Sequence, residues 1–507
     1  MLYVAGWTWA AEDEQTFSVL EYRVIGNSVL PVKTIEQAVM PHLGPGKTIK
    51  DVQAARADLE TAYHHAGYGT VYVDIPEQSV GEGIVRLRIT EGRLNRSTVT
   101  GARYFSERQI KAAVPEAKEG SVPQLQTLQS QIAQFNAESA DRTVVPVLKA
   151  GPIPGTVDLS MRVQDRLPLH GSIEVNNQYT ADTSPLRVLA TLSYGNLFGR
   201  LDNFSAQYET APQKPSQVGV LAANYSTRIG DSGNQLAAYV LHSDSNIAAL
   251  GTLAVLGRGN VYGVRWVDPL TRRADLQQTV TLGYDYKDYG QSVNVNPTTS
   301  LNTPIRYSNL SAAFGESLTH EFTQLQWSAS ANFGPRGAPN DENQFANKRY
   351  SAPANYFYVR GDGSFTLSGK SKWQLSLQLD GQWATEPVIS NEQFSVGGAA
   401  SVRGYLETEA LGDYGIRASL QAQPPPWQVS KQLLVIPFAF ADTARADILN
   451  ALPSDVPASR LRSIGAGFNF TALQCLSGNL TWADPLLSAG RTRAHDSRWL
   501  FDARCAW

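Results

Sequence analysis

The sequence of 507 residues predicts a membrane-spanning β-barrel of about sixteen antiparallel strands that follows two small α+β modules. Three observations support this fold class. The N-terminal third repeats one order of strand and helix signals, and the chain after about residue 169 shows only β signals, with apolar and polar residues in alternation. One glycine-rich segment with a central arginine interrupts that alternation.

The composition excludes some classes of protein. The chain has 43 basic and 46 acidic residues, a balance that does not indicate a nucleic-acid partner. No run reaches the roughly 18 consecutive apolar residues that a membrane helix needs. A membrane barrel remains compatible with the 42% of hydrophobic residues, because alternating strands average to a polar composition. The 21 Tyr and 10 Trp suit the aromatic girdles of such a barrel, although a soluble β-sandwich could also use them.

The first module is predicted over residues 17–93 and has the order β-α-α-β-β. A strand over 17–27 ends in a Gly-Asn turn, and Ile35, Val39 and Leu43 recur at helical spacing before Gly44. A second helical face follows, and two strands complete the module, of which the last alternates apolar residues with arginines. The two strands lie at 71–75 and around Val85, Leu87 and Ile89. The helical face consists of Val52, Ala55, Leu59, Ala62 and Tyr63.

The second module is predicted over residues 94–166 and repeats this order. Its signals are a strand at 98–105, a short helix at 110–114, a longer helix at 125–135, and strands near 142–145 and 157–163. A repeat of this kind indicates modular architecture. Residues 1–16 end in small residues like a signal-peptide cleavage region but lack a basic start, so they are interpreted as a remnant of a signal or linker.

The barrel is predicted over residues 167–507. The clearest strand is 373–380, where apolar and polar residues alternate without a fault, and the last strand, 498–507, ends in Trp507. A barrel of about sixteen strands encloses a lumen that its own side chains cannot fill. A plug or gate is therefore expected.

The segment at about 391–412, between the predicted eleventh and twelfth strands, has the length to fill the lumen. Gly397, Gly398 and Gly404 permit tight turns and close packing. Arg403 carries a planar fork of donors that can be buried only against a carboxylate. The alternative is an ordinary exposed hairpin loop.

Two short motifs of this chain resemble the signature pair of two-partner secretion transporters, the haemolysin secretion and activation type, in the superfamily that also contains the barrel-assembly proteins. The first is Val402-Arg403-Gly404-Tyr405, and the second is Phe440-Ala441-Asp442. The resemblance implies that the loop folds into the lumen and that Arg403 pairs with Asp442 on a lumen-facing strand. The glycine that usually stands two places after the aspartate is Ala444 here.

The resemblance also implies a location, partners and a function. The modules resemble POTRA domains, which lie in the periplasm and whose open sheet edge can add a strand of a client polypeptide. The chain is then a monomer of the bacterial outer membrane, inserted into its lipid by the barrel-assembly machinery. It secretes, and in some members activates, one large β-helical exoprotein. A barrel-assembly factor and a passive porin are the alternative functions, and a purely structural bridge is the alternative role of the Arg403–Asp442 pair.

Family members commonly begin with a helix that plugs the barrel. About sixteen residues precede the first module here, so either the start is truncated or the loop closes the barrel alone.

No catalytic motif is found, so neither an enzyme nor a cofactor is expected. The seven histidines show no spacing typical of metal ligands, and Glu407 and Glu409 are interpreted as solvated charges. Cys475 and Cys505 are the two cysteines of the chain. If their strands form a hairpin folded near Gly490, the cysteines lie opposite each other, which predicts either a disulfide or two free buried thiols.

Overall fold

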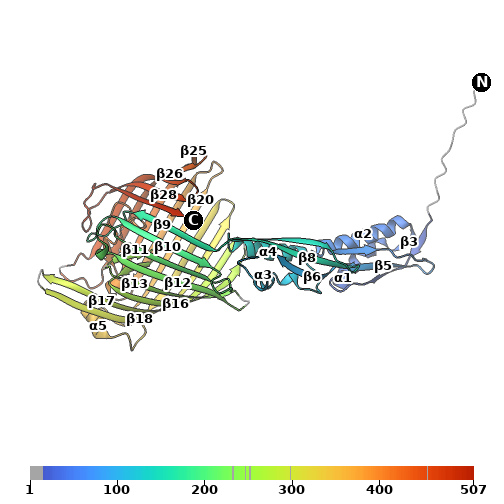
Figure 1. Cartoon of the computed structure of the whole chain (residues 1–507), viewed down its shortest axis with the longest axis horizontal. Helices are drawn as coiled ribbons and strands as arrows, with labels where there is room; N and C mark the ends of the chain where they lie inside the picture. The colour runs from blue at the N-terminus through green and yellow to red at the C-terminus, as the bar shows by residue number, and fades with distance from the viewer. Residues whose placement is uncertain are drawn as a thin grey trace, which may run out of the picture. The chain divides into compact units, whose positions relative to one another are not determined.

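The computed structural model of the chain describes residues 15–230, 233–245, 247–250, 253–273, 275–296, 299–453 and 455–507. The chain divides into two compact units, Met1–Pro168 and Leu169–Trp507. Residues 1–14 of the predicted N-terminal remnant lie outside the described residues. Helices α1 to α4 belong to the first unit, and strands β9 to β29 belong to the second (Figure 1).

The first module is a three-stranded sheet covered by two helices. The sheet has the order β2-β5-β4, in which β5 pairs parallel with β2 and antiparallel with β4. Val85, Leu87 and Ile89 of β5 are buried against the helices, as the alternation of this strand predicts. The elements are β2 (Glu21–Ile25), α1 (Val32–Val39), η1 (Met40–His42), α2 (Ile49–His65), β4 (Val71–Asp74) and β5 (Ile84–Glu91).

Two details of this module differ from the prediction. The single strand expected over 17–27 is two strands, β1 (Phe17–Val19) and β2, because the N–H groups of Leu20 and Glu21 both donate to the carbonyl of Gly83 and the chain changes partner there. The second difference is a strand that the sequence did not predict, β3 (Gly44–Lys47), which follows the end of the short helix and pairs antiparallel with β1.

The two edges of this sheet differ in how much backbone they leave open. The outer edge of β4 is occupied by α2, because Glu60 accepts from the N–H of Val73 at 3.4 Å and Arg56 donates to the Val73 carbonyl at 3.3 Å. The other edge is β2, which within the described part of the chain pairs with β5 alone. Leu20, directly before β2, and Ile25, its last residue, are both exposed. The open edge of the first module is therefore β2.

The second module repeats the same sheet topology, in the order β6-β8-β7, with β8 parallel to β6 and antiparallel to β7. The helices pack on this sheet through buried apolar side chains, which are Ile110, Leu128, Ile132 and Phe135. The elements are β6 (Arg93–Thr100), α3 (Glu107–Ala113), η2 (Pro115–Ala117), α4 (Leu125–Ala137), β7 (Arg142–Ala150) and β8 (Thr156–Asp165).

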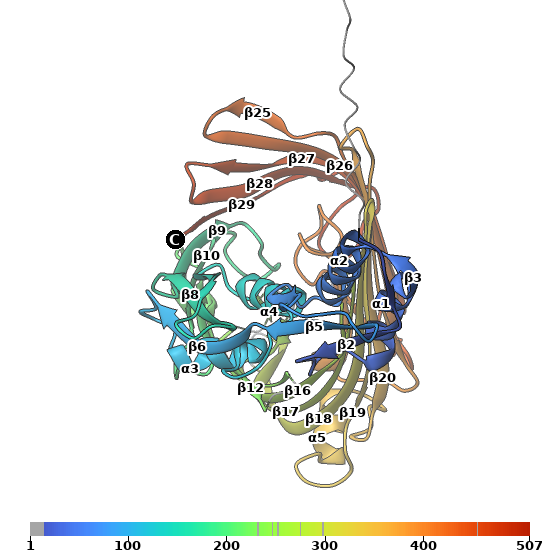
Figure 2. The same cartoon turned by 90° about the vertical axis from the view of Figure 1, so that its right-hand side faces the viewer.

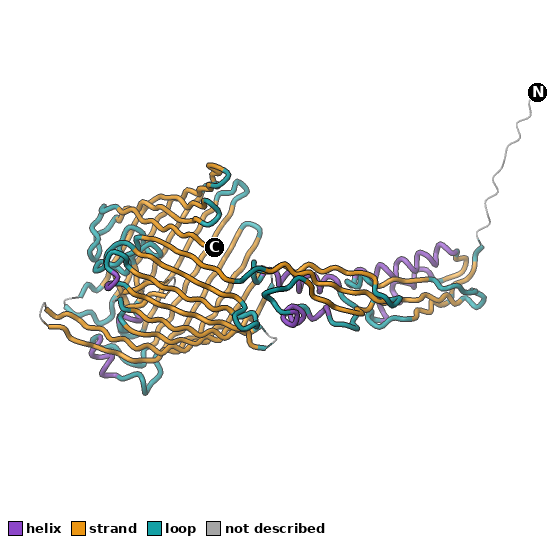
Figure 3. The backbone as a smooth tube through the Cα atoms, in the orientation of Figure 1, coloured by secondary structure: helices purple, strands orange, loops and turns teal. Residues whose placement is uncertain are grey.

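The second unit is a closed antiparallel barrel, which confirms the predicted fold class. Among the described residues it has sixteen strands when β24 and β25 (Trp427–Ser430), which both border β26, are counted together. Pairing of β29 with β9 closes the ring, and these two strands lie side by side in Figure 2. Figure 3 shows the strands of the barrel wall in orange. The strands are β9 (Leu169–Asn176), β10 (Arg187–Gly195), β11 (Asn203–Thr210), β12 (Gly219–Ile229), β13 (Asn234–Ser243), β16 (Gly259–Arg272), β17 (Leu276–Asn296), β18 (Thr299–His320), β19 (Thr323–Phe333), β20 (Phe357–Ser368), β21 (Gln374–Ala384), β24 (Tyr414–Gln423), β26 (Leu433–Asp447), β27 (Ala458–Ala472), β28 (Leu476–Pro485) and β29 (Arg498–Ala506).

The strands keep apolar side chains on the outside of the barrel. Leu375 and Leu379 lie on one face of β21, the strand that alternates most regularly in the sequence, and are 43% and 44% exposed. Trp373, directly before this strand, is 51% exposed. Apolar side chains on an outer face and polar side chains on the inner face are the pattern of a barrel in lipid. None of the described helices has the length and apolar character needed to cross a membrane.

The connections of the barrel are short at one end and long at the other. Short turns at 321–322, 369–373 and 431–432 alternate with longer segments. In outer-membrane barrels short turns face the periplasm and long loops face the outside. The longer segments include 334–356, which contains α5 (Glu342–Lys348), and 385–413, 448–457 and 486–497.

Candidate functional site

The candidate site is built on the segment between β21 and β24, the eleventh and twelfth strands of the barrel in chain order. The segment contains η4 (Ser390–Glu392) and a small antiparallel hairpin of β22 (Phe394–Val396) and β23 (Ala410–Gly412). The residues between β22 and β23 include the tip of the loop, residues 399–407. The tip carries the four residues Val402 to Tyr405.

The loop lies inside the barrel, against the inner face of β26. Along β26 the residues Phe438, Phe440, Asp442 and Ala444 are buried, whereas the residues between them, 439, 441 and 443, are exposed. In a strand alternate side chains point to opposite faces. Val402, Tyr405 and Phe394 of the loop form one buried cluster with Ala444, Ala446 and Leu461 of the wall. The loop therefore covers the lumen side of this wall.

The structure places Arg403 directly against Asp442. The guanidinium donates from Nε to Oδ2 and from Nη2 to Oδ1, both at 2.8 Å, and the backbone N–H of Arg403 donates to Oδ2 at 3.0 Å. The Asp442 side chain has no exposed surface, and that of Arg403 is 14% exposed. Two parallel charge-assisted bonds give such a pair geometric specificity as well as strength.

Three wall residues complete the contacts of the Arg403 guanidinium. Gln421 accepts from Nη1 at 2.7 Å and Ser419 accepts from Nη2 at 3.0 Å, both from β24. The Ser419 hydroxyl in turn donates to Asp442 at 2.6 Å. The ring of Phe440 lies 3.4 Å from the guanidinium carbon, a cation–π contact. These contacts leave the arginine fixed in one orientation.

Tyr405 anchors the tip to the neighbouring wall. Its hydroxyl donates to the carbonyl of Leu487 at 2.7 Å, lies 3.0 Å from the carbonyl of Arg462, and accepts from the N–H groups of both residues at 3.2 and 3.3 Å. Gly404 between Arg403 and Tyr405 has φ +95°, and a side chain there would meet Ala483 of β28 at 3.3 Å. The tip thus needs glycine at this position for both its backbone and its close approach to the wall.

Glu407 and Glu409 are not the solvated charges that the sequence suggested. Glu407 accepts from the N–H of Ala399 at 2.7 Å, across the tip. Glu409 accepts from the N–H of Leu406 at 2.9 Å and from the hydroxyl of Thr492 at 2.5 Å. The interpretation failed because carboxylates in a polar stretch can serve as acceptors for loop backbone, which composition does not reveal.

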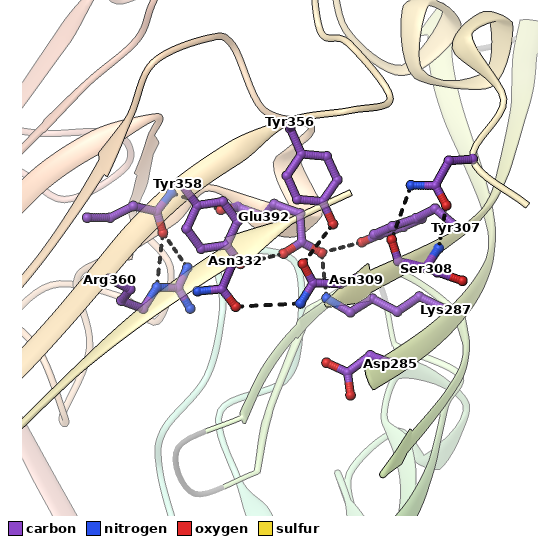
Figure 4. A network of polar contacts seen from close by, with 12 residues as sticks. Asp285, Lys287, Tyr307, Ser308, Asn309, Asn332, Tyr356, Tyr358, Arg360 and Glu392 are labelled. Atoms are coloured by element: carbon purple, nitrogen blue, oxygen red, sulfur yellow. Dashed lines mark hydrogen bonds and ion pairs between the residues drawn. The ribbon is translucent and has the colours of Figure 1, made fainter. Parts of the chain in front are cut away.

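A second polar network, which the sequence did not indicate, holds Glu392 at the start of the loop (Figure 4). Oε1 accepts from Lys287 and from the hydroxyl of Tyr307, both at 2.5 Å, and Oε2 accepts from the hydroxyl of Tyr358 at 2.7 Å. Glu392 is 2% exposed. Its partners come from β17, β18 and β20, at least 34 residues away in sequence, so no local motif could have identified them.

The end of the loop is held by an equally buried carboxylate. Asp413 accepts from Arg349 through both oxygens, and from the N–H groups of Val388 at 2.9 Å and Leu449 at 2.7 Å. The Asp413 side chain has no exposed surface. Arg349 belongs to the 334–356 segment, so this pair links three of the long segments at one end of the barrel.

The two cysteines are joined in the structure. Cys475 and Cys505 form a disulfide with a Cα–Cα distance of 4.8 Å. In the ladder of β28 and β29 the residue opposite Cys505 is Leu476, one position beyond Cys475. Among the described residues no cluster of three or more His, Cys, Asp or Glu could hold a metal ion.

The second unit is a closed barrel with an apolar outer face and a loop of its own in a polar lumen, and α+β modules precede it in the chain. These features define a class of protein, the outer-membrane barrels with periplasmic POTRA modules. The pattern of the haemolysin secretion/activation proteins ShlB, FhaC and HecB matches residues 155–468, and that of the ShlB-type POTRA domain matches residues 17–92. The chain belongs to this family. It is a transporter of the bacterial outer membrane that acts in two-partner secretion, with its POTRA modules in the periplasm.

Individual relatives agree with this assignment. The outer membrane transporter CdiB of Dickeya dadantii is 23% identical over 444 residues, which cover 82% of this chain and 73% of that protein. The heme/hemopexin transporter protein HuxB of Haemophilus influenzae is 21% identical over 495 residues, which cover 93% of this chain and 84% of the relative.

Solved structures share the fold. CdiB from Escherichia coli superposes with a TM-score of 0.67 at 19% identity, covering 99% of this chain and 93% of that chain. A BamA structure from Haemophilus ducreyi that lacks POTRA domains 1–3 superposes with a TM-score of 0.60 at 13% identity, covering 97% and 100%. The fold is thus common to transporters and to BamA, and the family match is what distinguishes them.

Proposed function

We propose that the loop at 391–412 is the gate of this transporter and that the Arg403–Asp442 pair holds the gate closed. The observation that carries this proposal is the pair itself, two-pronged and buried on the lumen side of β26. A barrel of sixteen strands encloses a lumen that its own side chains cannot fill, so a closed resting state needs a plug. The loop supplies that plug, and the tip must leave the wall before a polypeptide can pass.

The exported partner is a large β-helical exoprotein that the modules capture in the periplasm. The open edge of β2 in the first module supports this step, because an extended polypeptide can add to a free strand edge through backbone hydrogen bonds. The chain acts as a monomer, inserted by the barrel-assembly machinery, and performs no catalysis of its own. The folding of the exoprotein outside the cell draws it through the pore.

Deleting the gene for this chain should stop the release of one secreted protein and leave the other outer-membrane proteins at normal levels. The expected result follows because a transporter serves its partner, whereas an assembly factor serves many barrels. The measurement is quantitative proteomics of the medium and of isolated outer membranes, with the wild-type gene restored on a plasmid as the control. A general loss of outer-membrane barrels would instead support an assembly factor, and an unchanged medium would support a passive porin.

A further inference from the structure

The gating loop is attached to the barrel in two regions of different character. The first region is its stem, defined here as Glu392 to Val396 together with Ala410 to Asp413. The second region is its tip, residues 399–407, which carries Arg403 and Tyr405. The ion pairs of the two regions are equally buried, but the regions differ in the space around them and in the backbone that joins them.

The stem is fastened by two carboxylates, one at each end. Both oxygens of Glu392 accept hydrogen bonds from the wall, and its carbonyl also accepts from the amide of Gln382 on β21 at 2.9 Å. Both oxygens of Asp413 are satisfied by Arg349 and by backbone N–H groups. Breaking either site would leave a buried carboxylate without partners, which is strongly unfavourable. Glu392 therefore holds the stem to the wall, and Asp413 holds it to the neighbouring long segments, by contacts that are costly to break.

The tip has space beside it. A polar cavity of about 350 Å³ lies between the tip and the wall. It is lined by Ala399, Ala400, Ser401 and Arg403 of the tip and by Ser376, Gln378, Ser419 and Gln421 of β21 and β24. A polar cavity of this size holds several waters, so water can replace the contacts of Arg403 and Asp442 when they separate.

The backbone has residues with positive φ on both sides of the tip. Gly397 and Gly398 follow β22 directly and have φ of +104° and +102°, and Thr408 shortly before β23 has φ +55°. Glycine adopts positive φ without a steric penalty, and residues that absorb backbone rotation lie at the ends of moving segments. Paired glycines at this point are suited to act as a hinge.

We infer that the gate opens by movement of the tip alone, about a hinge at Gly397–Gly398, while Glu392 and Asp413 keep the stem fixed to the wall. This inference rests on the proposed gating function of the loop and specifies which part of the loop moves. Glu392 is then a positioning residue, since it sets where the hinge stands in the lumen. The width of the open pore is then set by the space that the tip vacates. The stem remains in the barrel during transport.

The test measures distances with pairs of spin labels in the full chain in lipid bilayers. One label is placed in the tip at Ser401→Cys or in the stem at Ser395→Cys, two half-buried serines of the same loop. The second label is always at Thr319→Cys, an exposed residue of β18. Cys475 and Cys505 are joined and do not take the label. Each pair is measured in the wild-type background and with Arg403→Ala, which releases the tip.

Arg403→Ala is expected to broaden or shift the distance from the tip label by more than about one residue length, roughly 3.5 Å, and to leave the distance from the stem label unchanged. A shift of both labels would overturn the inference, because the whole loop would then withdraw, and would leave the gating function standing. A shift of the stem label alone would also overturn it. If neither label moves, the Arg403–Asp442 pair does not hold the loop, and the proposed function fails together with the inference.

Discussion

Replacing Arg403 by alanine should lower secretion of the partner protein at least about tenfold while the barrel still assembles. Truncating one member of a buried ion pair leaves the other uncompensated and typically costs about 3–5 kcal/mol. Because the Asp442 side chain is fully buried, the substitution destabilises the position in which the tip lies against β26. A free-energy difference of about 1.4 kcal/mol changes an equilibrium constant tenfold, so loss of the pair lets the tip occupy many positions instead of one. A gate whose tip is no longer held in one position opens without the client, so opening and transport are no longer coupled and secretion falls.

The measurement compares exoprotein in the medium with transporter in the outer membrane. Arg273→Ala is the matched control, because Arg273 pairs with Asp275 at 2.7 Å but is 68% exposed in a turn, where such pairs contribute little. The double variant Arg403→Ala/Asp442→Ala removes both charges and should recover the thermal stability of the barrel without recovering secretion. If the double variant recovers both, the pair is only a structural bridge. Normal secretion by Arg403→Ala alone would contradict a role in gating.

Deleting residues 17–92 should abolish secretion and leave the barrel and its gate intact. This segment is the first module, which carries the open β2 edge on which capture of the client depends. The contacts of Arg403, Glu392 and Asp413 all lie within residues 169–507, so the loop should keep its position in the shortened chain.

Two measurements check the deletion. Exoprotein in the medium reports capture, and the gel mobility of unheated and heated samples reports a folded barrel, because folded barrels resist detergent. The expected result is background secretion from a folded barrel. Secretion at the wild-type level would show that the second module or the barrel recognises the client, and a loss of the folded form would make the deletion uninformative about capture and require point substitutions in β2.

The sequence alone predicted the architecture because each element has a local period. The strand 373–380 alternates without a fault, and Val52, Leu59 and Tyr63 keep one helical face, so barrel and modules follow from patterning. The loop was found because its glycines break that alternation. Its partner Asp442 was identified by the resemblance to a family, since a single carboxylate at the end of an apolar run has no local signal.

The stem contacts could not be predicted from sequence. Lys287 and Tyr307 lie 105 and 85 residues from Glu392, and only the closed barrel brings them together. The open β2 edge is likewise a property of the fold, because it depends on α2 covering the other edge through Arg56 and Glu60. Long-range pairing of polar groups has no period, and so the sequence pattern contains no record of it.

Single-channel conductance of the purified protein in planar bilayers tests the gating claim most directly, with wild type beside Arg403→Ala. The account predicts small, flickering conductance for the wild type, and larger or more frequent openings for the variant because its tip is no longer held on β26. A large, steady pore that the substitution leaves unchanged would contradict the account, since the loop would then not close the lumen.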